Sequence, residues 1–569
     1  MKRFILLLTS YLLVVSCSTR QSPADLVIRG GKIYTMAGVT PVVEAVAVKG
    51  DRIVALGNEA DITKHIGTNT QIIDLAGRIA TPGFIEGHGH LMGIGYNELE
   101  LDLTGLKSFD ELVTQVAAAA KKAQPGDWII GRGWHQDKWE VAPERLIKGF
   151  PLHDQLSAAS PDNPVFLHHA SGHAAFANAK AMEVAGVNQL SREQLKRGEG
   201  EGGEIIRDEK GNPTGLFNER AMSLIQSHVP ENSDSRNRQA LELALKACLR
   251  NGITSFHDAG AGRKTIDLYH QYKNEGKLEV RLYVMITGED RALMYEWLRK
   301  GPEIDSTGWL TIRSIKLHCD GALGSRGAWL LEAYSDRAGF HGMATLPMDT
   351  VLKTSREALK HGFQVCAHAI GDRANREILD RYEMAFKENS PGAIDPRFRI
   401  EHAQHLDPAD IPRFSSLGVI PAMQAIHMSS DRPWAIERLG KQRIETGAYM
   451  WQSLLKTGAK IVNGTDAPVE PVNPIPSFYA SVSRRTLKGE PKGGYEPKEK
   501  MSRDQALRSY TLDAAYGAFE ENLKGSIEVG KLADFTIFTR DLMTIPEDDI
   551  LRTEVSAVVV GGKIAYTKP

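Results

Sequence analysis

Eight short apolar segments recur along the middle of the chain, most of them followed by a segment with helical periodicity. They span residues 82–90, 252–258, 279–287, 311–320, 362–368, 397–402, 418–424 and 459–466. Apolar runs of this length are typical of buried parallel strands. Two of the helical segments, NRQALELALKACLRNG and TVLKTSREALKHG, end at glycine as helices commonly do. The pattern predicts an α/β fold, namely a (β/α)8 TIM-like barrel.

The two ends of the chain carry a different pattern, with short β-type runs separated by turn residues. It occurs in DLVIRGGKIYTM, EAVAVKGDRIVALG and TQIIDLAGRIATPG, and returns in KGSIEVGKLADFTIFTR and AVVVGGKIAY. Neither end has enough strands for a stable sheet of its own. We therefore expect residues 24–81 and 523–569 to form one composite β-sandwich domain, and residues 82–522 to form the barrel.

About 160 residues separate the first two barrel segments, far more than an ordinary connection between a strand and a helix. This stretch has β-like segments of its own, DWIIGRGW and PVFLHHASGH, and the helical segment SFDELVTQVAAAAKKA. We interpret residues 91–250, approximately, as a subdomain inserted after the first strand and placed over the C-terminal mouth of the barrel.

The N-terminus has the features of a signal peptide over residues 1–16. Lys2 and Arg3 precede an apolar run at 4–15, which is too short to span a bilayer. The sequence VVSC at 14–17 resembles a bacterial lipobox, which implies lipidation of Cys17 and a membrane anchor; a secretory signal without lipidation is the alternative. Because Ser18 follows Cys17, the resemblance favours the periplasmic face of the outer membrane of a Gram-negative cell.

Composition excludes several classes of protein. The 569 residues carry a formal charge of −2 and are 42% hydrophobic, which is ordinary for a globular chain and excludes disorder, coiled coil and collagen. There is no basic excess to neutralise phosphates, so nucleic acid is not an expected partner. The four cysteines are too scattered for a disulfide framework or a CxxC metal site, and Cys366 is expected to fill the barrel interior.

Residues that can bind a metal stand at the C-terminal ends of five of the eight predicted strands, the edge of a barrel at which active sites form. They are His88, His90, Lys316, His368, His402 and Asp466. Each alone has an ordinary structural explanation, but independent core residues would not share one edge. Imidazole and carboxylate donors suit Zn²⁺ best, with Fe²⁺ and Mn²⁺ as alternatives.

A set of longer motifs identifies a family. PGFIEGHGH, GRGW, HHASGHAAFAN, IKLHCDGALGSR, CAHAIGDRAN, RIEHAQ, NGTDAPVEP and KLADFTIF occur in this order. Together they resemble the amidohydrolase superfamily, specifically its YtcJ-like branch, also called amidohydrolase family 3. The resemblance extends over essentially the whole chain after the signal peptide. One position differs from many relatives, which have Asp where this chain has Glu86.

The resemblance implies a role for each metal-binding candidate. His88 and His90 correspond to ligands of a more buried metal ion, and His368 and His402 to ligands of a more exposed one. Lys316 corresponds to a lysine that family members carry as an N6-carboxylated bridge between two ions, and Asp466 to a metal ligand that also shuttles a proton. The sequence leaves open whether one or two ions bind and whether Lys316 is modified.

The implied activity is hydrolysis of a non-peptide C–N bond in a small molecule, such as an N-acyl or N-formyl amine or a cyclic amide. A metal-activated hydroxide would attack the carbonyl, and Asp466 would pass its proton to the leaving nitrogen. Two alternatives are an esterase or lactonase that uses the same site, and a non-catalytic lipoprotein that binds ligands at the cell surface. The presence of Asp466 argues against the second. A homo-oligomer is left open.

Residues for substrate contact are less sharply indicated. His173 resembles the residue that hydrogen-bonds the reacting carbonyl, with a structural turn histidine as the alternative. Asp320 and Arg326 either orient substrate or form a surface ion pair. Trp134 and Trp139 either form an aromatic wall or pack inside the insertion.

Overall fold

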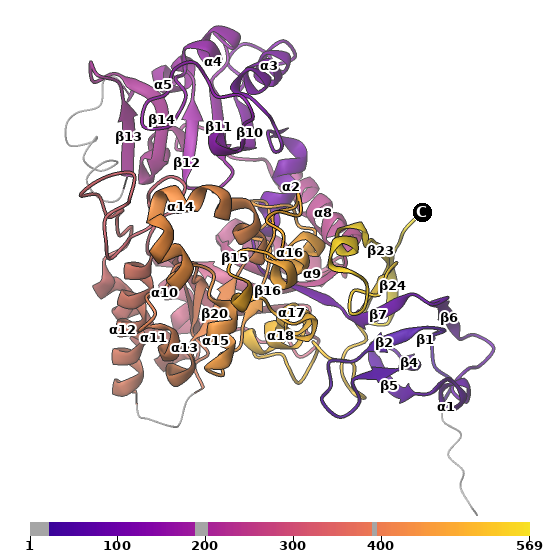
Figure 1. Ribbon diagram of the computed structural model, residues 1–569. Helices are drawn as coiled ribbons and strands as arrows, with labels where there is room; N and C mark the ends of the chain where they lie inside the picture. The colour runs from indigo at the N-terminus through magenta and orange to yellow at the C-terminus, as the bar shows by residue number, and fades with distance from the viewer. Residues whose placement is uncertain (1–21, 188–202, 390–394) are drawn as a thin grey trace, which may run out of the picture.

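The computed structural model describes residues 22–187, 203–389 and 395–569. Cys17 and the expected signal peptide lie outside these ranges. Figure 1 shows three regions: a central barrel, an inserted sheet above it, and a pair of small sheets built from the two ends of the chain. No helix in the described ranges combines the length and the apolar composition needed to cross a membrane.

The central sheet has eight parallel strands in sequential order, which confirms the predicted α/β barrel. They are β8 (Phe84–Gly89), β15 (Ile253–Ala261), β16 (Arg281–Thr287), β17 (Leu310–His318), β18 (Gln364–Ala369), β19 (Arg399–His402), β20 (Ile420–Met423) and β21 (Val462–Asn463). The first and last strands come together, since a Cβ atom on Gly87 of β8 would collide with Val462 and with the backbone of Asn463.

Helices cover the outside of the barrel because the outward-facing side chains of its strands, such as Val284, Val365 and Ile400, are apolar. They include α8 (Asp234–Arg250), α9 (Arg263–Asn274), α10 (Arg291–Lys300), α11 (Met348–His361), α12 (Asp372–Glu388), α13 (Ile411–Leu417), α15 (Trp451–Lys456), α16 (Pro474–Ser483), α17 (Arg503–Ser509) and α18 (Leu512–Gly517). Helix α11 ends at Gly362, whose φ of 77° is left-handed and therefore favours glycine, as the sequence indicated.

The segment between β8 and β15 contains a six-stranded mixed sheet, larger than the two β-like segments in the sequence indicated. Its strands, in spatial order, are β13 (Gly203–Arg207), β14 (Pro213–Glu219), β12 (Ala174–Ala177), β11 (Val165–His169), β10 (Ile129–Trp134) and β9 (Leu101–Asp102). Helices α3 (Phe109–Ala120), α4 (Asp154–Ala159) and α5 (Ala179–Val184) accompany it at the top of Figure 1.

The two ends of the chain share a sheet. In spatial order it contains β24 (Lys563–Thr567), β23 (Val555–Val560), β22 (Phe535–Phe538), β7 (Ile79–Pro82), β2 (Lys32–Tyr34) and β3 (Val42–Val43). A second sheet contains β5 (Arg52–Gly57), β4 (Ala45–Lys49), β1 (Leu26–Arg29) and β6 (Gln71–Asp74). A buried ion pair ties the C-terminal strands to the barrel, with Arg281 Nε 2.7 Å from Asp534 Oδ2.

Candidate metal centre

The six predicted metal-binding residues come together at the C-terminal mouth of the barrel. His88, Lys316, His368 and His402 lie on β8, β17, β18 and β19; His90 precedes α2 (Leu91–Leu99), and Asp466 follows β21. A cavity of about 1390 Å³ opens above them and is lined by five of the six, all except His88. His88 is 1% exposed and lies at the floor of this site.

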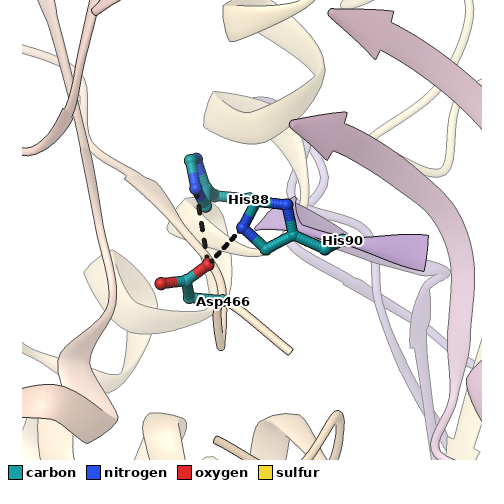
Figure 2. A group of neighbouring side chains, drawn as sticks. All are labelled: His88, His90 and Asp466. Carbon is teal, nitrogen blue, oxygen red and sulfur yellow. Dashed lines mark ion pairs between the residues drawn. The ribbon is translucent and has the colours of Figure 1, made fainter. Parts of the chain in front are cut away.

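Asp466 joins the two histidines of the HxH motif. Its Oδ1 lies 3.1 Å from His90 Nε2 and 3.5 Å from His88 Nε2, as Figure 2 shows. One ligand atom from each of the three residues falls within 4.8 Å of the others, the compact spacing that a single metal ion requires. The position of Asp466 is fixed by its backbone N–H, which donates to the carbonyl of His88 at 2.9 Å.

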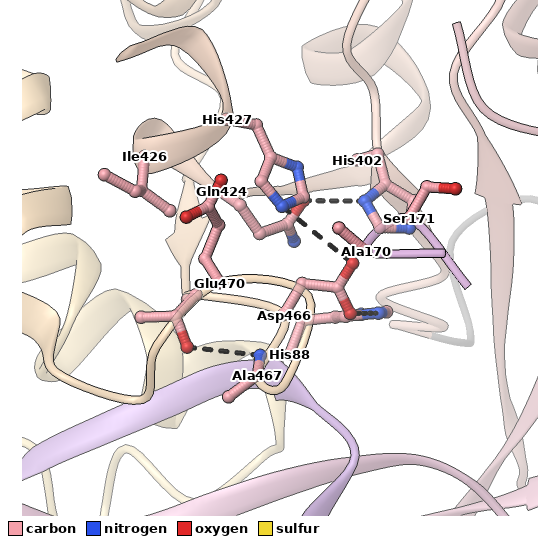
Figure 3. A network of polar contacts seen from close by, with 12 residues as sticks. His88, Ala170, Ser171, His402, Gln424, Ile426, His427, Asp466, Ala467 and Glu470 are labelled. Atoms are coloured by element: carbon pink, nitrogen blue, oxygen red, sulfur yellow. Dashed lines mark hydrogen bonds and ion pairs between the residues drawn. The ribbon is translucent and has the colours of Figure 1, made fainter. Parts of the chain in front are cut away.

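A second compact group shares the same carboxylate. His402 and His427 each offer a nitrogen that lies, with an Asp466 oxygen, in a set whose members are all within 4.8 Å of one another. His427 Nε2 is 4.0 Å from Asp466 Oδ2, and His402 Nδ1 is 2.7 Å from Gln424 Oε1 (Figure 3). Since Nδ1–H of His402 donates to the Gln424 oxygen, its Nε2 is left as the ligand atom. The sequence analysis missed His427, which lies in the first turn of α14 (Ala425–Gly447).

Lys316 and His368 lie next to these groups but belong to neither. Lys316 Nζ is 3.3 Å from His88 Nε2, and the rings of His368 and His402 are 4.5 Å apart between centroids. His368 Nε2 is 3.4 Å from Asp320 Oδ1. The predicted division of the metal ligands into a His88/His90 pair and a His368/His402 pair is therefore only one way to group these side chains. His427 is a further candidate metal ligand.

Burial sets the protonation states. It lowers the pKa of His88 to about 4, with the Lys316 charge acting in the same direction, so this imidazole is neutral and able to bind a metal. Burial also lowers the pKa of the Lys316 amine. For Asp466 burial acts to raise the pKa, but the hydrogen bond from His90 and the neighbouring imidazoles hold it well below its usual range. Asp466 is consequently an ionised carboxylate.

A buried ion pair beneath the site orients His88. His88 Nδ1 hydrogen-bonds to Glu401 Oε2, and Arg399 donates to the same carboxylate from Nε at 2.7 Å and from Nη2 at 2.9 Å. Both Glu401 and Arg399 are 0% exposed. The carboxylate fixes the tautomer in which Nε2 of His88 faces Asp466. Sequence reasoning missed Glu401, although it directly precedes a predicted ligand in RIEH.

The candidates for substrate contact separate into two groups. His173 lies at the centre, with its ring 5.0 Å from that of His368 and its Nδ1 2.8 Å from Glu219 Oε2. Asp320 also lines the cavity, but it is fully buried and accepts hydrogen bonds from the backbone N–H groups of Trp329, Ile370 and Gly371. It therefore holds loops in place, and burial raises its pKa to about 7.

Arg326 and the two tryptophans are outside the set of residues that line the cavity. Arg326 Nη2 pairs with Asp336 Oδ2 at 2.8 Å, which corresponds to the ion-pair alternative. Trp134 is 0% exposed and donates from Nε1 to the Leu167 carbonyl at 3.0 Å, and Trp139 packs beside it. Since burial in the core of the inserted sheet removes Trp134 from the cavity, we do not retain it as a substrate contact.

The donor atoms of the site fit a divalent cation. Within the described ranges, Nε2 of His368 and Nε2 of His427 are buried without a hydrogen-bond partner. Buried polar atoms are normally paired, because leaving one unpaired costs about 1–3 kcal/mol. A cation coordinated by imidazole nitrogen and carboxylate oxygen would satisfy these atoms, and three or four such ligands are the usual set for zinc.

A parallel barrel with this cluster at its mouth defines a metal-dependent hydrolase. Residues 71–566 match the family described as "Amidohydrolase family", and the chain belongs to it. The protein is accordingly a C–N hydrolase that uses a divalent metal. The alternative of a protein that binds ligands without catalysis is therefore wrong.

Known relatives span nearly the whole chain. Protein LONG AFTER FAR-RED 3 of Arabidopsis thaliana is 34% identical, covering 95% of this chain and 92% of its own. Putative amidohydrolase YtcJ of Bacillus subtilis is 32% identical, over 95% and 99%. N-substituted formamide deformylase of Arthrobacter pascens is 26% identical, over 96% and 98%. The crystal structure of an uncharacterized metal-dependent hydrolase from Pyrococcus furiosus superposes with a TM-score of 0.70 at 27% identity, over 91% and 100%.

Replacing Glu401 tests the orientation of His88. In Glu401→Gln the amide cannot fully replace the carboxylate that accepts from His88 Nδ1, so we expect metal affinity to fall about 10- to 100-fold. The measurement is the metal retained during dialysis against a graded series of a competing chelator.

The matched control is Glu303→Gln. Glu303 also accepts from an imidazole, with His270 Nε2 3.0 Å from its Oε1, but this pair lies outside the cavity lining. We expect this variant to retain metal like the unmodified protein. Equal retention by Glu401→Gln would show that Glu401 does not support the metal site.

Proposed function

We propose that the protein hydrolyses the C–N bond of a small N-formyl or N-acyl amine or of a cyclic amide. The observation that carries this proposal is the meeting of Asp466 with the imidazoles of His88, His90 and His402 at the floor of a cavity of about 1390 Å³. This volume accommodates a small molecule. The 26% identity to an N-substituted formamide deformylase over nearly the full length supports the formyl member of the class.

We propose Zn²⁺ as the metal. His88, His90 and Asp466 form one donor set and His402, His427 and Asp466 a second, so these residues would hold one ion or two. When bound, such an ion polarises a carbonyl and makes water acidic near neutral pH. Metal analysis of the purified protein distinguishes zinc from iron and manganese and gives the number of ions.

Asp466 is positioned to carry the proton. Its ionised carboxylate accepts a proton from the attacking water, and the protonated acid then donates to the departing nitrogen, which is a poor leaving group without protonation. The short contact between Asp466 Oδ1 and His90 Nε2 holds the carboxylate at the cavity floor during this exchange.

His173 is positioned to bind the carbonyl oxygen. Burial disfavours a charged imidazole, but the Glu219 carboxylate at 2.8 Å from Nδ1 raises the pKa of His173. In the protonated form Nδ1–H donates to Glu219 and Nε2–H is available to the substrate. A donor of this kind stabilises the negative charge that develops on the oxygen during attack.

We further propose that Lys316 is N6-carboxylated. Its amine is buried and has a lowered pKa, which favours the neutral form that attacks CO₂; the new N–C bond forms with loss of one proton. In the described part of the chain the Lys316 amine forms no ion pair with a carboxylate, so no ion pair is lost when the amine becomes neutral. Carbon-13-labelled bicarbonate is expected to give a carbamate resonance that is absent from Lys316→Met.

Lys524 supplies the control for this modification. It is also buried, but its Nζ forms an ion pair with Glu520 Oε2 at 2.7 Å. Lys524→Met is expected to keep the carbamate resonance. A spectrum without this resonance in the metal-loaded, unmodified protein would overturn the assignment of Lys316.

Substitution of Asp466 tests the proposed reaction. On a panel of N-substituted formamides, N-acetyl amines, cyclic amides and matching esters, we expect Asp466→Asn to lower kcat by about 10²- to 10⁴-fold, because an amide cannot carry the proton. Metal content is measured for both proteins, so that loss of metal is distinguished from loss of the proton carrier. Asp541→Asn, at a carboxylate paired with Lys32 in the terminal sheets, is the control and should retain full turnover.

The panel also decides between the substrate classes. Turnover of the formamides that falls in Asp466→Asn supports the proposal, whereas equal turnover by the variant would remove Asp466 as the proton carrier. Hydrolysis of the esters alone would favour an esterase or lactonase. If the metal-loaded protein hydrolyses no member of the panel, the proposed substrate class is wrong.

We also propose that Cys17 is lipidated and anchors the protein to the periplasmic face of the outer membrane of a Gram-negative cell. The support is the VVSC sequence after a short apolar run. Expressed in such a cell, the protein is expected to partition into the detergent phase in a phase-separation assay, and Cys17→Ala to move to the aqueous phase. Unchanged partitioning of the variant would contradict lipidation.

A further inference from the structure

One face of the inserted sheet forms a wall of the substrate cavity. Arg132 on β10 and His168 on β11 are cross-strand neighbours, and both line the cavity. The alternating positions on these two strands, Ile129, Val165 and Leu167, point to the opposite face and pack together in a hydrophobic core. Strand alternation therefore directs Arg132 into the cavity rather than toward the core.

The Arg132 guanidinium has few partners for a charged group in such a position. Its Nη2 donates to the Ala170 carbonyl at 3.0 Å, while its Nε is buried and has no hydrogen-bond partner. Over the described ranges it forms no ion pair. A partly buried arginine is normally paired with a carboxylate or another anion, because its charge is costly to remove from water.

The carboxylates around the cavity are engaged elsewhere. Glu100 pairs with Arg236 at 3.3 Å, Glu219 with His173 at 2.8 Å and Glu289 with His318 at 3.3 Å. Glu231 pairs with Lys264, and Asp320 accepts backbone hydrogen bonds. The cavity wall thus presents a positive charge that forms no ion pair within the described ranges; Glu100 and Asp466 act on it electrostatically without direct contact.

Arg132 lies close enough to the metal centre for one small molecule to reach both. A Cβ atom placed on Gly172 would be 3.5 Å from Arg132 Nη2, so the guanidinium packs directly against this glycine. The next residue is His173, whose ring is 5.0 Å from that of His368. Figure 3 shows Ala170, whose carbonyl accepts from Arg132, beside His402.

The same wall also has an apolar part. Trp128 and Ile130 are partly exposed there and pack together with Phe166, and all three line the cavity. A ligand that extends from the metal centre along this wall therefore meets a cation first and an apolar strip beside it. This combination matches a molecule that carries both an anionic group and a hydrophobic group.

We propose that Arg132 binds a carboxylate of the substrate, so that the C–N hydrolase acts on N-formyl or N-acyl amines that bear a carboxylate near the scissile bond and an apolar side chain. This inference rests on the proposed function. The planar guanidinium suits a carboxylate, which it can bind through two parallel hydrogen bonds. Nη1 of Arg132, which forms no hydrogen bond within the described ranges, is available for one of them.

The test compares two N-formyl compounds that differ only in the carboxylate. N-formylphenylalanine carries it, and N-formylphenethylamine lacks it but retains the apolar group. We expect kcat/KM to favour the carboxylate, and Arg132→Gln to lower kcat/KM for that compound about 10- to 100-fold, as the loss of a charge-assisted hydrogen bond predicts. Turnover of the neutral compound should change by less than about 3-fold.

Two further variants define the interaction. Arg132→Lys keeps the charge but not the planar fork, so its preference for the carboxylate should be intermediate. Arg263→Gln removes an arginine that is paired with Glu296 and lies outside the cavity lining, and should leave the preference between the two compounds unchanged. Thermal unfolding of each variant verifies that it is folded.

A binding measurement separates this inference from the proposed function. 3-Phenylpropionate has the carboxylate and the apolar group but no scissile bond, and calorimetric titration measures its affinity directly. We expect Arg132→Gln to weaken its binding at least about 10-fold. Equal binding by both proteins would overturn the role of Arg132 even if formamides are hydrolysed. Arginine-dependent binding without turnover of any formamide would support the carboxylate site and reject the proposed reaction.

Discussion

The electrostatic interaction between one buried carboxylate, that of Asp466, and the imidazoles around it is the interaction on which the rest of the site depends. Asp466 lies within 3.5 Å of both His88 and His90 and within 4.0 Å of His427. It reaches this position with a φ of 58°, a left-handed conformation that is uncommon outside glycine. Such strain persists only where surrounding contacts enforce it, here including the hydrogen bond from its N–H to the His88 carbonyl.

A buried ion pair inside the barrel, in addition to apolar packing, holds one of these imidazoles, that of His88, in position. Arg399 and Glu401 are 0% exposed, and their ion pair stands directly below His88. A buried pair of this kind contributes little net stability, since desolvation offsets much of the attraction. Its effect is orientational: the carboxylate accepts from His88 Nδ1, and Arg399 also donates to the Gly87 carbonyl, so the HxH strand is held in place.

The sequence was sufficient for the barrel and for six residues at its mouth because both follow from strand periodicity. All eight apolar runs became strands, and side chains at the C-terminal ends of parallel strands must meet. His427 could not be found in this way, because it lies in a helix after β20 and reaches Asp466 only through the path of that helix. Trp134 ends a strand too, but a register shift between Arg132 and Trp134 in the pairing of β10 with β11 places its side chain in the core.

The inserted sheet was harder to predict because its pairings mix parallel and antiparallel neighbours and do not follow the single repeating order of the barrel. The inserted sheet nevertheless packs closely against a loop of the barrel. Glu219, at the end of β14, lies against Gly321 and Gly327 of the loop after β17, and a Cβ atom on either glycine would collide with its Oε1. Gly321 of the CDGALGSR motif and Gly327, which directly follows this motif, therefore leave room for the carboxylate that hydrogen-bonds to His173.

The barrel and the inserted sheet contribute different parts of one site. The barrel supplies the donor atoms around Asp466, and the inserted sheet supplies His173 and the wall that carries Arg132. Residues on the wall can change without disturbing the metal ligands, because the two sets belong to different sheets. The contact of Glu219 with the barrel loop and its hydrogen bond to His173 fix the position of His173 relative to the barrel, so the two sheets hold their contributions to the site in a set geometry.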